Sequence, residues 1–178
     1  IVLPQALRRR GLTEEKFLQG RLNGANKLSQ YAVMSSLRSS RAALMEHLLG
    51  TAEATTKFAI EDFTKATKTG DVIGRLRAVT GKIPKSKLSI ALPEWLSDSD
   101  LHRAACAQDI EIYRQIADLV GDMSAQREYQ KVQLLARLAD KYPYILAFDS
   151  RPFTLAVIQL MRQTLEPGPR ILVATGDT

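Results

Sequence analysis

Disulfide chemistry is excluded from this sequence of 178 residues, because it contains a single cysteine, Cys106. Chains that are poor in cysteine are typical of reducing compartments, so we expect a cytoplasmic location. Alanines surround Cys106 and no thiolate-stabilising residue stands beside it, so we expect a small core residue and not a nucleophile. Because no run of about 20 apolar residues is present, we expect no membrane partner.

The usual motifs of nucleotide and metal chemistry are also missing. The sequence has no G-x-x-x-x-G-K-[ST] phosphate-binding loop and no Asp-Glu-x-His box. The two histidines, His47 and His102, lie far apart in the sequence and outside any cluster of ligand residues, which argues against a zinc site. We therefore expect no catalytic residue, no metal site and no cofactor in this chain by itself.

Positive charge is in excess, with a formal net charge of +6. Residues 1–50 carry eight Lys and Arg against three Asp and Glu, and residues 65–87 carry seven against Asp71 alone. Such an imbalance indicates a polyanionic partner, although a solvated charged surface is the plainer explanation of charge alone. The best candidates for contacts to nucleic-acid phosphates are Arg8, Arg9, Arg10, Lys82, Lys85 and Lys87.

Helical periodicity dominates the chain up to Asp140. Thr13 followed by two glutamates predicts a helix start, and Gly50 and Gly121 predict helix ends. Residues 81–97 contain glycine and prolines and are predicted to connect helices. The expected helices cover residues 27–49, 51–67, 71–80, about 100–120 and 124–140.

The pattern changes after Pro143. Residues 144–148 form a short apolar run, Pro152 can open a helix over 153–165, and residues 171–174 form a second apolar run. A strand, helix and strand in this order predict a parallel pair. The predicted fold is therefore mostly α with a small α/β part: a helical region over 1–123, then a second part over 124–178 that ends in a βαβ unit with strands at 144–148 and 171–174. Because domains seldom stop just after a buried strand, we expect both chain ends to be cut.

Five segments carry a family resemblance: Lys131–Leu138, Ile145–Arg151, Thr154–Leu155, Ala174–Thr178 and, more weakly, the serine-rich Ser35–Leu44. The first four together resemble the opening of the second RecA-like lobe of superfamily-two helicases, and most of all the Snf-type, chromatin-remodeller-like ATPases. Ser35–Leu44 is similar to a helix that several bacterial members place between their lobes. The resemblance implies an inter-lobe helical region followed by the start of a RecA-like parallel sheet.

The resemblance also implies a function: a piece of a nucleic-acid-dependent ATPase that contacts the backbone of duplex DNA and couples lobe closure to movement. The other lobes of the parent protein would be its partners and would bind ATP and magnesium. This chain alone would not hydrolyse ATP, because phosphoryl transfer needs phosphate-binding and metal-binding groups together.

Two loops of that family architecture add candidate phosphate contacts. They are Ser150, Arg151 and Thr154 after the first predicted strand, and Thr175 and Gly176 after the second. The simpler explanations are that Ser150 only caps a helix and that the second loop is an ordinary polar turn. The alternative function is a helical module that binds nucleic acid or another protein and has no ATPase parent.

Overall fold

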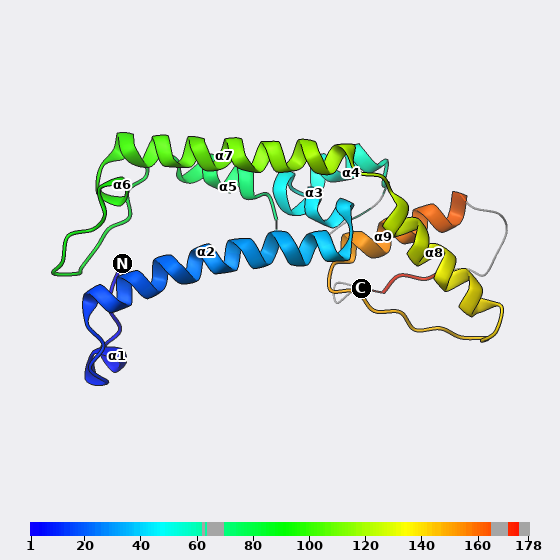
Figure 1. Cartoon of the computed structure of the whole chain (residues 1–178), viewed down its shortest axis with the longest axis horizontal. Helices are drawn as coiled ribbons and strands as arrows, with labels where there is room; N and C mark the ends of the chain where they lie inside the picture. Colours follow the sequence, from blue (N-terminus) through cyan, green and yellow to red (C-terminus); the bar gives the residue numbers. More distant parts are fainter. Residues whose placement is uncertain (62, 64–69, 165–170, 175–178) are drawn as a thin grey trace. The chain divides into compact units, whose positions relative to one another are not determined.

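The computed structural model describes residues 1–61, 63, 70–164 and 171–174 (Figure 1). Helices account for 69% of these residues, which confirms the predicted helical majority. In chain order they are α1 (Gln5–Arg9), α2 (Glu14–Ser39), α3 (Arg41–Leu49), α4 (Thr51–Phe58), α5 (Val72–Val79), α6 (Glu94–Ser97), α7 (Ser99–Asp122), α8 (Gln126–Ala139) and α9 (Pro152–Thr164). None of them is long and apolar enough to cross a membrane.

Local residues set several of these boundaries, and those at Gly50 and Pro152 were predicted. Asp98 Oδ1 accepts the backbone N–H groups of Asp100 at 2.8 Å and Leu101 at 2.9 Å, which fixes the start of α7. Gly50 ends α3 with a φ of 89°, a conformation that favours glycine. Pro152 is the first residue of α9, where the missing N–H costs no helical hydrogen bond.

The predicted helix over 27–49 is in fact two helices, because Ser40 interrupts it. Ser40 is extended, with φ −164° and ψ 161°, and its Oγ accepts the N–H of Ala43 at 2.9 Å. The prediction over 51–67 is also too long, since α4 ends at Phe58 and Ala59 takes a left-handed conformation. The short helix α6 lies inside the segment that was predicted to be only a connection.

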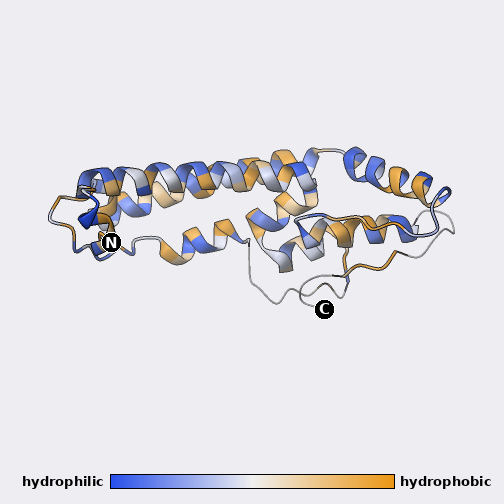
Figure 2. Ribbon diagram, turned by 90° about the horizontal axis from the view of Figure 1, so that it is seen from below, coloured by the Kyte–Doolittle hydropathy of each residue, from blue (hydrophilic) through white to orange (hydrophobic). Residues whose placement is uncertain are grey.

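The predicted C-terminal βαβ unit is wrong: the described residues contain no strand and no sheet. Residues 144–148 and 171–174 are irregular, and no backbone hydrogen bond joins either segment to another part of the described chain. Ile171 C=O accepts instead from the side chain of Gln159 at 3.2 Å. No strand arrow is drawn for the described residues in Figure 2. Aromatic and branched residues favour strands, but a strand exists only where a neighbouring backbone takes up its N–H and C=O groups. Tyr144, Leu146 and Phe148 are exposed in the structure instead of packed.

The chain forms two compact units, each built from two stretches of sequence. Unit 1 comprises residues 1–32 and 75–112, and unit 2 comprises residues 33–74 and 113–178. Helices α2, α5 and α7 contribute to both. The predicted division after residue 123 separates the chain differently and stays a prediction.

Unit 2 contains the two apolar clusters of the described chain. In the first, Leu44 and Leu48 of α3 pack with Ala117 and Val120 of α7. In the second, Phe153 of α9 is fully buried and meets Phe58 and Phe63 edge to face, with ring centroids 6.1 Å and 5.1 Å away. Fully burying side chains of this size contributes about 1.5–3 kcal/mol each, so these clusters are the main source of stability in unit 2.

Unit 1 has fewer buried apolar residues, and they are spread along the chain: Leu3, Leu18, Leu96, Cys106 and Ile110. The burial of Cys106 agrees with the core position expected for it. Much of unit 1 is α2 up to Ala32, α7 up to Ile112 and the irregular segment that precedes α6.

Candidate functional site

The loop over residues 81–89 of unit 1, called here the lysine loop, carries Lys82, Lys85 and Lys87, all of which are exposed. Its first residue is held by side chains from the start of α7. The N–H of Gly81 donates to His102 Nδ1 at 3.1 Å, and the C=O of Gly81 accepts from Ser99 Oγ at 3.1 Å. Gly81 has a φ of 72°, which a residue with a side chain adopts only with strain.

The other end of the lysine loop is held by the first residues of the chain. The N–H of Lys87 donates to the carbonyl of Ile1 at 2.8 Å, and Figure 1 shows this loop descending beside the N-terminus. The N–H of Ser89 donates to Glu14 Oε2 at 2.6 Å. The same carboxylate binds the guanidinium of Arg8, with 2.7 Å between Oε1 and Nη2. Unit 1 therefore joins the lysine loop to the arginine triplet Arg8–Arg10, which lies far away in the sequence.

The charge of the chain is concentrated in this unit. Unit 1 contains twelve Lys and Arg against seven Asp and Glu, whereas unit 2 contains thirteen against twelve. The side chains of Arg9, Arg10 and the three lysines form no ion pair within the described residues. Exposed cations without an internal partner can approach phosphate oxygens. We call Arg9, Arg10, Lys82, Lys85 and Lys87 the composite basic surface.

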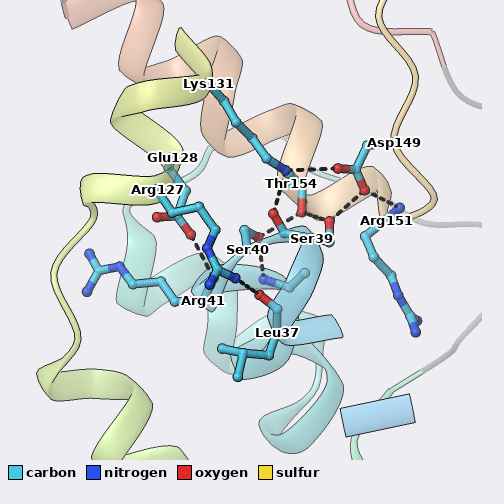
Figure 3. Close-up of polar contacts among 11 residues, drawn as sticks. Leu37, Ser39, Ser40, Arg41, Arg127, Glu128, Lys131, Asp149, Arg151 and Thr154 are labelled. Atoms are coloured by element: carbon cyan, nitrogen blue, oxygen red, sulfur yellow. Dashed lines mark hydrogen bonds and ion pairs between the residues drawn. The ribbon is translucent and has the colours of Figure 1, made fainter. Parts of the chain in front are cut away.

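A second polar centre lies in unit 2, at the break between α2 and α3 (Figure 3). Thr154 Oγ1 of α9 shares hydrogen bonds with Ser39 Oγ at 2.5 Å and Ser40 Oγ at 2.7 Å. Ser39 Oγ also donates to Asp149 Oδ1 at 2.5 Å. Lys131 donates to the carbonyl of Ser39 at 2.6 Å and lies 3.3 Å from Asp149 Oδ2. We call these five residues the hydroxyl network.

Helix α8 supplies charges of the correct sign to both helix ends at this break. Arg127 donates to the carbonyl of Leu37 at 2.6 Å, near the C-terminus of α2, as Lys131 does to that of Ser39. Glu128 Oε1 accepts the N–H of Arg41 at 2.7 Å, at the N-terminus of α3. Cations stabilise the last carbonyls of a helix and anions its first N–H groups. Glu128 is buried, and its Oε2 has no hydrogen-bond partner among the described residues.

The hydroxyl network is closed and gives no sign of catalysis. Ser40 and Thr154 are fully buried and Ser39 is 7% exposed, which leaves a substrate no access to these hydroxyls. Lys131 reaches a carbonyl oxygen and a carboxylate, and no bond from it to a serine hydroxyl is present. A general base must reach the proton that it removes, so this arrangement holds α2, α3, α8 and α9 together and does not activate a nucleophile.

The phosphate contacts predicted at the start of α9 differ in their accessibility. Ser150 is exposed, and the guanidinium of Arg151 points away from the hydroxyl network in Figure 3. The hydroxyl of Thr154 is buried inside that network, so a phosphate could reach it only after the network opened. Asp149 accepts the N–H of Arg151 at 2.9 Å, which brings a negative charge to the same helix terminus. Thr175 and Gly176 lie outside the described residues.

The structure therefore brings together the arginine triplet and the lysine loop in unit 1, and places Ser150, Arg151 and Thr154 in unit 2. The contacts of Glu14 beyond a helix start, and the contact between Lys131 and Asp149, were not predicted from the sequence. A capping serine was visible at Ser40, because its hydroxyl stands three residues before the N–H that it accepts. No local signal relates Glu14 to Ser89.

Among residues 1–61, 63, 70–164 and 171–174, no group of three or more His, Cys, Asp and Glu side chains could hold a metal ion. No family model matches the chain, and neither a search of curated proteins nor one of solved structures finds a significant similarity.

Proposed function

We propose that this chain binds the phosphate backbone of duplex nucleic acid, and that the composite basic surface of unit 1 makes the main contacts. The observation that supports this most directly is the double role of Glu14, which contacts Arg8 of the arginine triplet and Ser89 of the lysine loop. Clustered exposed lysines and arginines neutralise phosphates and release their counterions, which is a sequence-independent source of affinity.

We further propose that the parent protein is a helicase-like ATPase of the Snf type, that it acts in the cytoplasm and that its other lobes bind ATP and magnesium. Support comes from the hydroxyl network, because it joins residues from four segments that carry the resemblance: Ser39 and Ser40, Lys131, Asp149, and Thr154. The missing strand pair removes one support that the sequence had suggested. In this proposal the chain contributes backbone contacts and lobe coupling, and it has no ATPase activity by itself.

The test is a titration of the full chain with fluorescently labelled duplexes of two unrelated sequences, followed by anisotropy. Titrations should begin at roughly 20–50 mM salt, where the counterion contribution is large. We expect similar affinity for both duplexes and a steep linear fall of log K with log salt. Binding that is independent of salt, or specific for one sequence, would contradict the proposal. Turnover of ATP by the purified chain, above a mock-purified control, would contradict the proposal that this chain has no ATPase activity by itself.

A protein-interaction module remains the second candidate, because one apolar segment of unit 2 is strongly exposed. Tyr144, Leu146 and Phe148 are 92%, 86% and 91% exposed, and exposed apolar side chains this close together can contact a partner protein. If the chain binds neither duplex even at low salt, this candidate is favoured. Replacing all three with Ser should then abolish binding of the partner protein while leaving the helical content unchanged.

A further inference from the structure

Glu14 makes two contacts at once in unit 1, and its side chain is only 12% exposed. One carboxylate oxygen binds the exposed guanidinium of Arg8, and the other accepts the backbone N–H of Ser89. A carboxylate can accept from both donors because each oxygen has free lone pairs. The first turn of α2 is thereby attached to both basic segments.

The lysine loop depends on such contacts for its order. It contains no helix or strand, so it is held by a few hydrogen bonds: Gly81 to the start of α7, the carbonyl of Lys85 and the N–H of Lys87 to Ile1, and Ser89 to Glu14. Ordering a flexible loop when a ligand binds reduces the affinity, and a loop that is ordered beforehand avoids that loss. Glu14 is the residue through which this order also reaches the arginine triplet.

We propose that Glu14 is a positioning residue that holds the arginine triplet and the lysine loop in one arrangement for binding a nucleic-acid backbone. This inference rests on the proposed function. It predicts that removing the charge of Glu14 weakens the binding of nucleic acid, whereas the change of charge alone would strengthen it. Removing a negative charge from a basic surface strengthens the attraction for a polyanion, whereas losing the positioning contact weakens the binding.

The decisive comparison is Glu14→Gln against Glu15→Gln. Both variants lose one negative charge from the first turn of α2, so their effects on the helix dipole and on the long-range field are matched. Glu15 is exposed and forms no ion pair or side-chain hydrogen bond within the described residues. Gln keeps the size of Glu14 but has one acceptor oxygen, and its NH2 group would face one of the two donors.

We expect Glu14→Gln to weaken duplex binding by about three- to tenfold, as when a few side chains must be ordered during binding. Glu15→Gln should bind as tightly as the unchanged chain or more tightly. Ser89→Pro is a second variant, because it removes the N–H that donates to Glu14 without changing any charge. It should weaken binding as Glu14→Gln does. If Glu14→Gln binds at least as well as Glu15→Gln, the positioning role is wrong.

Amide hydrogen exchange without nucleic acid separates this inference from the proposed function. In Glu14→Gln, exchange at Lys87 and Ser89 should accelerate at least tenfold, while exchange in the middle of α7 and the far-UV circular dichroism stay as in Glu15→Gln. Unchanged exchange at Ser89 would refute the positioning role of Glu14, whatever the affinity. If the unchanged chain fails to bind duplex although Glu14→Gln accelerates exchange, the contact is structural and the proposed function is the part that fails.

Discussion

The interactions that stabilise unit 1 internally differ from those that stabilise unit 2. In unit 2, aromatic and aliphatic side chains form two buried clusters, and the hydroxyl network joins four helices. In unit 1, buried apolar residues are scattered, and contacts between side chains and backbone hold the lysine loop. The net charge follows the same division, because unit 1 carries nearly all of the excess. The contacts that we propose for nucleic acid therefore lie in the unit with the charge excess, and the buried clusters lie in the other.

The largest expected effect is the loss of stability in Phe153→Ala. Phe153 is fully buried between Phe58 and Phe63, so removing its ring should lower the free energy of unfolding by about 3–5 kcal/mol. Urea denaturation followed by circular dichroism measures this change. The matched control is Phe148→Ala, which removes the same ring from a position 91% exposed and should change stability by less than about 0.5 kcal/mol.

The fluorescence of Trp95 reports the unfolding of unit 1 separately in this experiment, because it is the only tryptophan and it lies in unit 1. If the units have separate sources of stability, the fluorescence midpoint of Trp95 should fall less than the midpoint followed by circular dichroism. Equal shifts would mean that both units unfold as one through α2 and α7, which would end the proposed contrast in stability.

The next effect is on binding, in the triple variant in which Lys82, Lys85 and Lys87 become Ala. The slope of log K against log salt should become shallower by up to about three, roughly one for each lost phosphate contact. The matched control replaces Lys57, Arg137 and Lys141, three exposed cations of unit 2, with Ala. Because its net charge changes equally, a general field effect would alter both variants alike. An unchanged slope in the lysine-loop variant would move the binding surface to another part of the molecule.

Helix boundaries that depend on residues close together in the sequence could be predicted. The terminating Gly50 and the opening Pro152 each act within a few residues, and both helix boundaries were expected from them. The break at Ser40 was missed because the apolar spacing continues across it, although the serine itself favours a helix start. Local patterns therefore predict where helices begin and end better than whether a long periodic segment is one helix or two.

Features that depend on contacts between residues far apart in the sequence could not be predicted. Residues 144–148 have a strand-like composition, but strand formation requires a partner backbone that the described chain does not provide. The basic residues of the candidate surface were all identified from charge and spacing. Their assembly was not, because nothing in the sequence shows that Glu14 contacts Ser89 or that Thr154 is buried against Ser39.

A smaller loss of stability is expected for Thr154→Val, which keeps the shape of the side chain and removes its hydroxyl. Ser40 Oγ would still accept the N–H of Ala43, and Ser39 Oγ would still donate to Asp149. The cost should therefore be about 1–2 kcal/mol, within the range for a buried polar group that loses one partner. Urea denaturation measures it, and duplex affinity should stay unchanged. Weaker binding in this variant would instead give the hydroxyl network a part in nucleic-acid recognition.

The smallest effect is expected for Arg151→Ala. Its guanidinium points away from the hydroxyl network and forms no ion pair within the described residues, so it can make one phosphate contact (Figure 3). Losing that contact should reduce the salt slope by at most about one. The carboxylate of Asp149 lies at the same helix terminus and repels a phosphate there, although Lys131 offsets part of its charge.

Arg137→Ala is the control for Arg151→Ala, because Arg137 is an exposed cation on another helix of the same unit. Both variants should show the same preference between two unrelated duplexes as the unchanged chain, since phosphate contacts position a protein without reading sequence. If Arg151→Ala lowered affinity as much as the triple lysine variant, the start of α9 would be the main contact. The division between a binding unit 1 and a supporting unit 2 would then be reversed.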